Sequence, residues 1–112
     1  PHALFGRRDA YSLSLVAFDP ASGQLRTVDG PVRGEGVLPE NAAFDRDGDT
    51  VAVAVFHERS EAPREGWVQF WQIDRSGREP RLRPTVHRVA VPRGAHDLLV
   101  VDPRPPRDAA SR

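Results

Sequence analysis

Leu13-Ser-Leu-Val-Ala-Phe-Asp19 and Val68-Gln-Phe-Trp-Gln-Ile-Asp74 are the two stretches of sequence that decide the fold. Each is a short apolar run that ends in Asp, and after each a turn containing Ser-Gly leads to a further run that includes Leu25 or Leu82. The two Asp residues are 55 positions apart (74 − 19). Because Ser and Gly suit tight turns between antiparallel strands, the pair predicts two copies of one hairpin.

A second pair of similar stretches gives nearly the same spacing. Pro39-Glu-Asn-Ala-Ala-Phe-Asp45 resembles Ala95-His-Asp-Leu-Leu-Val-Val-Asp102, and their Asp residues are 57 positions apart (102 − 45). Radial arrays of four-stranded sheets repeat every ~40 to 50 residues, and loop insertions lengthen the period. We therefore expect an internal repeat of four short strands, with residues 57–66 as an insertion.

The predicted strands are apolar on both faces. In the strand predicted over residues 50–57, the valines from Val51 to Val55 share one face and Ala52 and Ala54 share the other. No segment shows a capped helical stripe that could cover such a sheet, so other sheets must cover it. The expected fold class is all-β, a β-propeller fragment with antiparallel four-stranded blades, about one full blade plus two partial ones.

This interpretation divides the chain into four parts. Residues 1–30 are expected to end a preceding blade, with its outer strands at 11–18 and 24–28. Residues 31–91 form one complete blade, residues 92–102 contain the first strand of the next blade at 98–101, and residues 103–112 form a disordered tail rich in Pro and Arg. The strands of the complete blade are expected at 39–45, 50–57, 67–74 and 85–91.

Composition excludes several classes of protein. The chain has 112 residues, a formal net charge of zero and 38% hydrophobic residues, which is typical of a globular domain. It has no apolar run of ~20 residues, so no membrane partner is expected. Acidic and basic residues alternate without a basic stripe, so no nucleic-acid partner is expected. Cysteine is absent, which removes disulfides and thiolate chemistry.

No cofactor and no metal site are expected from the sequence. The four histidines lack the spacing of a metal site, although ligands from different blades are an open alternative. Asp45-Arg-Asp47-Gly-Asp49 alternates carboxylates as a calcium loop does, but its Gly comes two positions too early. A turn between two strands is the preferred interpretation of this segment.

The blade predicted here resembles a known family. Pro39 to Gly48, then Val51 to Val55, then Val68 to Asp74 with a Ser-Gly turn, is similar to a blade of the bacterial seven-bladed propellers of the lactonase-like and YVTN-repeat type, which are related in shape to WD40 propellers. The resemblance implies the C-terminal part of a longer bacterial protein, with any signal peptide upstream. It leaves the compartment open between bacterial cytoplasm and periplasm.

The same resemblance implies two alternative functions. One is a scaffold module that binds a small molecule, such as a lactone or sugar, or a protein, with the remaining blades of the parent chain as partners. The other is a lactone hydrolase or isomerase, whose Arg, His and Glu residues line the mouth of the central channel. Arg93 and His96 are the positions of this sequence that can be carried over.

Propeller geometry also predicts where a site lies. The connections at residues 30–41, 57–66 and 92–97 should emerge on one end of the array, around the channel. Lactone hydrolysis requires a base and a group that stabilises the oxyanion. Glu40, Glu58 and His96 are candidate bases, with Arg93 as oxyanion partner and Asn41, His57 and Asp97 as ligand-binding residues. In the structural alternative, Asn41 and Asp97 cap turns and Arg93 pairs with a carboxylate.

Overall fold

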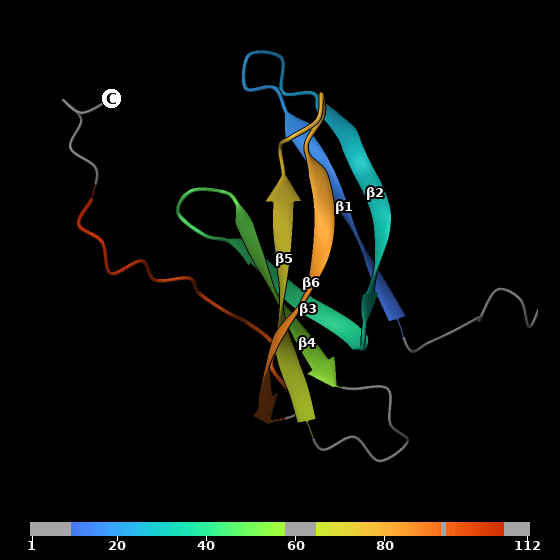
Figure 1. Cartoon of the computed structure of the whole chain (residues 1–112), viewed down its shortest axis with the longest axis vertical. Coiled ribbons are helices and arrows are strands. Elements are labelled where there is room, and N and C mark those ends of the chain that lie inside the picture. The colour runs from blue at the N-terminus through green and yellow to red at the C-terminus, as the bar shows by residue number, and fades with distance from the viewer. Residues whose placement is uncertain (1–9, 58–64, 93, 107–112) are drawn as a thin grey trace, which may run out of the picture.

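The computed structural model describes residues 10–57, 65–92 and 94–106, and all of its regular elements are strands (Figure 1). The first two strands pair with each other, and the last four form a sheet in chain order, with every pair antiparallel. The prediction of an all-β, antiparallel fold is confirmed. The described residues include no helix with the length and hydropathy to cross a membrane. The strands are β1 (Ala10–Phe18), β2 (Leu25–Glu35), β3 (Val37–Phe44), β4 (Thr50–His57), β5 (Glu65–Asp74) and β6 (Arg81–Pro92).

Strand β4 lies inside the four-stranded sheet and is buried on both sides, as its composition predicts. Every residue from Val51 to Val55 is buried. Its valines join Trp67 and Trp71 of β5 on one side of the sheet, which we call the core face. The opposite side, which we call the second face, carries Ala52, Ala54, Val68, Phe70 and Val89.

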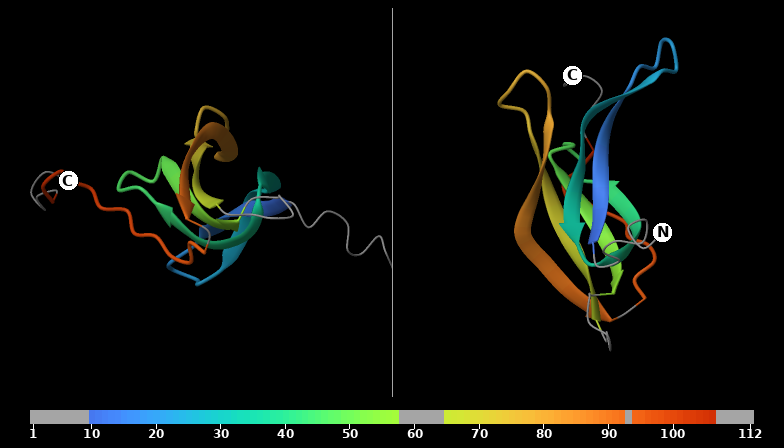
Figure 2. Two further views of the ribbon diagram at one scale, coloured as in Figure 1. Left: turned by 90° about the horizontal axis from the view of Figure 1, so that it is seen from below. Right: turned by 90° about the vertical axis from the view of Figure 1, so that its right-hand side faces the viewer.

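The β1–β2 hairpin covers the core face (Figure 2). Tyr11 of β1 is part of the buried core, and Leu13, Leu15 and Val32 pack against it. Gly34 is required opposite Tyr11, because a Cβ atom at that position would collide with the aromatic ring. The molecule therefore consists of two layers, a hairpin and a sheet, with an apolar core between them.

The β1–β2 hairpin and the β5–β6 hairpin pair in the same register. Adding 55 to the residue numbers of β1 and 57 to those of β2 converts Leu13↔Val32 into Val68↔Val89, and Phe18↔Leu25 into Ile73↔Leu82. In both hairpins the pairing is interrupted by a bulge at the equivalent place, between Leu13 and Val16 in β1 and between Gln69 and Trp71 in β5. The repeat seen in the sequence is therefore also a repeat of strand pairing.

The connection between β2 and β3 is much shorter than the one predicted over residues 30–41, so this prediction is wrong. Strand β2 continues to Glu35 and β3 starts at Val37, so the break between them is a tight turn at Gly36, which has a φ of 98°. Pro31 does not end β2 because it falls in the bulge, where no ladder hydrogen bond is lost. The β1–β2 hairpin therefore extends to Glu35, past the expected boundary between residues 30 and 31.

Other boundaries also differ from the sequence prediction. Strand β6 starts at Arg81, before the expected residue 85, because Pro84 is tolerated on an edge strand. His57 is the last residue of β4, as predicted for the strand over residues 50–57, so the connection expected from residue 57 starts after it. Residues 98–101 form no strand, since they have no partner strand among the described residues.

Candidate functional site

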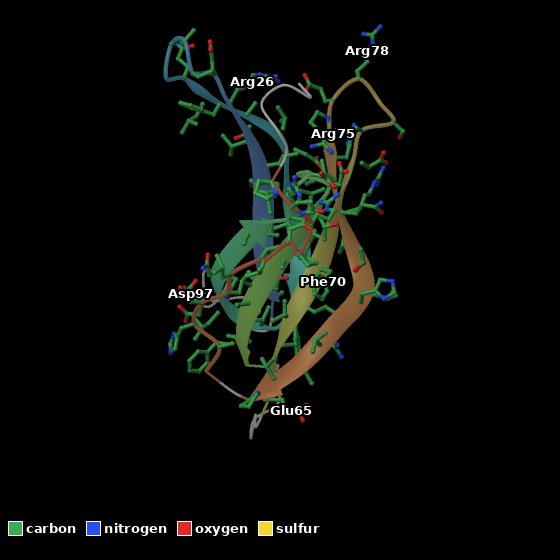
Figure 3. The ribbon with its side chains drawn as sticks, turned by 90° about the vertical axis from the view of Figure 1, so that its left-hand side faces the viewer. Arg26, Glu65, Phe70, Arg75, Arg78 and Asp97 are labelled. Carbon is green, nitrogen blue, oxygen red and sulfur yellow. The ribbon has the colours of Figure 1, made fainter. Side chains whose placement is uncertain are left out.

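Four of the seven predicted site residues meet at one end of the molecule. This end carries the Gly36 turn, the start of β5 and the segment that follows β6. Figure 3 shows Glu65 and Asp97 towards this end, while Arg75 and Arg78 lie at the opposite end. Glu40 and Asn41 of β3 are brought together there with His96 and Asp97, and we call these four residues the loop-end cluster.

Hydrogen bonds hold the loop-end cluster in place. The Asn41 side-chain amide donates to the Asp97 carboxylate, while the Asn41 side-chain oxygen accepts from the backbone of Ala42 at 2.7 Å. Asp97 also accepts from the backbone of Leu98 at 2.8 Å. Each side chain therefore bonds the backbone of its own neighbour, and the bond between Asn41 and Asp97 fastens the segment after β6 to strand β3.

His96 and Glu40 form the ionisable part of the cluster. The His96 Nδ1 atom lies 3.8 Å from the Glu40 Oε2 atom. The imidazole also packs edge-on against Phe56 of β4, with 5.1 Å between the ring centroids, and the backbone N–H of Gly94 donates to the Phe56 carbonyl at 3.1 Å. The His96 side chain is 69% exposed. An exposed His beside a carboxylate is able to exchange protons and hydrogen bonds with a ligand in solution.

The other three predicted site residues are not placed in the cluster. Arg93 and Glu58 lie outside the described residues, so the expected oxyanion partner and one candidate base are untested. His57 ends β4 opposite Val37, and its side chain also lies outside the description.

The acidic segment from Asp45 to Asp49 forms a turn between β3 and β4. The Asp45 carboxylate accepts from the backbone N–H groups of Asp49 at 2.9 Å and Thr50 at 3.1 Å. Burial alone would raise the pKa of Asp45, but these N–H groups together lower it below its usual range.

The other carboxylates of this turn are paired with arginines. Asp49 bonds Arg75, and Asp47 lies 3.1 Å from Arg104, which also bonds Asp102. The hydrogen bonds from Arg104 lower the pKa of Asp102 to about 2. Among the described residues, no group of three or more His, Asp and Glu side chains is arranged to hold a metal ion. The geometry of the segment is that of a turn, as preferred from the sequence.

A buried polar triad was not predicted from the sequence. The Trp71 indole N–H donates to the Tyr11 hydroxyl at 3.1 Å, and this hydroxyl donates to the Gln69 side-chain oxygen at 2.6 Å. Burial raises the pKa of Tyr11 to about 12. The one signal in the sequence was Gln69 itself, a lone amide inside the apolar run from Trp67 to Trp71.

Comparison of the chain with protein-family models, curated proteins and solved structures finds no match. The fold and the site define the protein as an all-β chain with two hairpin repeats and a polar cluster at one end.

Proposed function

We propose that the chain consists of consecutive repeats of a β-propeller of the lactonase-like, YVTN-repeat type, which forms part of a scaffold that binds a ligand or partner at its loop end. The observation that carries the proposal is the common register of the β1–β2 and β5–β6 hairpins, including the bulge. Two hairpins that are merely similar in composition have no reason to share a bulge position, whereas repeats of one blade do.

The exposed side of the β1–β2 hairpin supports the proposal that a preceding repeat packs against it. Phe18 and Leu25 are 62% and 69% exposed, whereas their equivalents Ile73 and Leu82 are 6% and 5% exposed because the first hairpin covers them. An apolar face that is buried in one repeat and open in the other indicates a missing layer.

The second face of the sheet supports the proposal that a following repeat packs against it. Leu13 and Val32 pack against the core face, but their equivalents Val68 and Val89 lie on the second face, where Val89 is 55% exposed. Layers of the same kind on both sides would bury these residues. The proposal therefore explains why both repeats are apolar on both faces.

The loop-end cluster is the binding site of this scaffold. In a radial array, one end of successive blades surrounds the central channel, and the cluster joins strand β3 to the segment after β6 at this end. Asn41 and Asp97 fix the segment after β6, and they leave His96 and Glu40 exposed as donor and acceptor. This arrangement suits a small polar molecule or a polar protein loop.

Self-association of the purified chain tests the stacking of repeats. We expect sedimentation velocity to show reversible assembly that increases with concentration, because the open apolar faces pair with each other. Phe70→Ser or Val89→Ser on the second face should weaken assembly at least about tenfold, by removing apolar area from the contact. Val86→Ser is the matched control, since Val86 is 93% exposed in the β6 bulge.

A chain that stays monomeric at every concentration and unfolds in one sharp, concentration-independent transition would refute the proposal. So would equal loss of assembly in Val86→Ser and Val89→Ser, because area on the second face would then be irrelevant. Circular dichroism of each variant separates loss of assembly from loss of the fold.

Lactone hydrolysis is the second candidate function, and the distance of 3.8 Å between His96 and Glu40 favours it. Such a pair acts as a general base when the carboxylate orients the imidazole and the imidazole removes a proton from water. The assay is hydrolysis of glucono-δ-lactone by the protein and by its His96→Ala and Glu40→Gln variants. The enzymatic proposal requires a loss of rate in both variants, and rates equal to that of the unaltered protein would eliminate it.

A further inference from the structure

A groove separates β2 from the β5–β6 hairpin, on the core-face side of the sheet. It has a volume of about 430 Å³, and its walls include Gly34 and Glu35 of β2 and Pro84 and Arg88 of β6. Gln69 of β5 also lines it. The bulge in β6 opens the groove, because β5–β6 pairing stops at Gln69↔Arg88 and resumes at Trp71↔Pro84. A volume of this size is typical of sites for small molecules.

The amide group of Gln69 is oriented by the buried triad. An indole N–H can only donate, so the Tyr11 oxygen accepts from Trp71 and the Tyr11 hydrogen goes to Gln69. Gln69 must therefore turn its oxygen towards Tyr11, which leaves its NH₂ group on the other side. Among the described residues this nitrogen has no hydrogen-bond partner, and it is not sealed from solvent, since Trp67 Nε1 is the one fully buried side-chain nitrogen or oxygen without a partner.

Because Gln69 lines the groove, its free amide nitrogen needs an acceptor from the groove side. Water fills this role in the free protein, and a ligand oxygen would fill it in a complex. The groove therefore has one fixed donor whose direction is set by the core.

Arg88 and Glu35 add a second donor and an acceptor at the edge of the groove. The Arg88 guanidinium carbon lies 4.3 Å above the Trp67 ring, and one of its nitrogens is 3.5 Å from the Glu35 carboxylate. Stacking on the indole holds the planar group in place. The two charges cancel, so the lining of the groove attracts neither anions nor cations strongly.

We propose that this groove binds a small, neutral, polyhydroxylated molecule. Each hydroxyl group both donates and accepts, which matches the donors on Gln69 and Arg88 and the acceptor on Glu35. Pro84 and the β6 bulge supply an apolar wall for the C–H faces of such a molecule. The groove is separate from the loop-end cluster and does not depend on the proposed scaffold function. A layer on the second face would leave it open.

Side-chain NMR signals of the full chain provide the test, with D-glucose, D-mannose and myo-inositol as neutral probes and D-glucuronate as the charged probe. We expect at least one neutral probe to shift the Gln69 NH₂ signals saturably, and glucuronate to bind more weakly. Arg88→Gln and Glu35→Gln should each weaken binding at least about tenfold. Arg83→Gln should not, because Arg83 also lies on β6, 3.5 Å from Asp74, but outside the groove.

Three results would overturn the proposal. The first is the absence of a saturable shift with all three neutral probes. The second is binding that persists unchanged in both Arg88→Gln and Glu35→Gln. The third is tighter binding of glucuronate than of D-glucose, which would assign the groove to carboxylates. Backbone spectra of the variants confirm the fold, since both altered side chains are about half or more exposed.

Discussion

Replacing Tyr11 with Phe removes one oxygen from the contact that joins the hairpin to the sheet. The ring stays, so the packing around Gly34 is retained, but Trp71 and Gln69 both lose their hydrogen-bond partner. The Trp71 side chain is fully buried and its N–H cannot reach water, which costs about 1–3 kcal/mol. The Gln69 oxygen loses less, because Gln69 lines the groove and water can replace the hydroxyl.

We therefore expect Tyr11→Phe to lower the free energy of unfolding by about 2 kcal/mol. Urea unfolding followed by tryptophan fluorescence measures this quantity, at one protein concentration because assembly would also add stability. Ser12→Ala is the control, since Ser12 is the exposed neighbour of Tyr11 on β1. A loss in Tyr11→Phe no larger than in Ser12→Ala would show that the triad does not hold the two layers together.

Three further predictions concern the same contacts. Gly34→Ala should lower the free energy of unfolding in urea by about 1–3 kcal/mol, because the added Cβ meets the Tyr11 ring. Gly77→Ala is the control and should leave urea unfolding nearly unchanged, because its Cβ meets only ordinary contacts. Asp45→Ala removes the two hydrogen bonds that the Asp45 carboxylate accepts from backbone N–H groups in the β3–β4 turn, and thermal unfolding should show a loss of about 1–2 kcal/mol. No loss would mean that water replaces the carboxylate. Burial raises the pKa of Tyr11 from 10.0 to about 12, so the protonated form is favoured in the folded chain. Its contribution to stability should be complete below about pH 10 and should disappear as the pH rises through about 12, a dependence that Tyr11→Phe should lack.

The strands that lie inside the sheet could be predicted because their apolar residues occupy both faces. Val51 to Val55 satisfy this pattern, and β4 has the predicted bounds of residues 50–57. Strand ends at the edges were harder to predict. Pro31 and Pro84 indicate breaks in the sequence, but one lies in a bulge and the other on an edge strand, where a missing N–H is tolerated.

The loop-end cluster was predictable in part: the repeat brings residues 92–97 to the end where β3 begins, but Glu40 and Asn41 lie within β3 and not in the predicted connection. Glu40, Asn41, His96 and Asp97 meet since the segment after β6 returns to β3. The groove was not predictable, because it depends on a bulge and on the direction of one amide. Neither the unpaired residues of β6 nor the orientation of Gln69 has a signature in a single sequence. Residues 98–101 were predicted as a strand because residues 95–102 resemble residues 39–45 in the repeat, but a strand needs a partner to supply its hydrogen bonds.

The two open sides of this molecule are different from each other, with Phe18 and Leu25 on one and Val68 and Val89 on the other. Contacts between unlike surfaces are heterologous, and each addition presents the same surface again, so growth stops only when the rotation per step closes a circle. The bulges in β1–β2 and β5–β6 set the local twist and hence this rotation. In the stacking proposed above, a change of backbone at either bulge would then alter this rotation, and with it the choice between a ring and a fibre, without altering any residue of the contact.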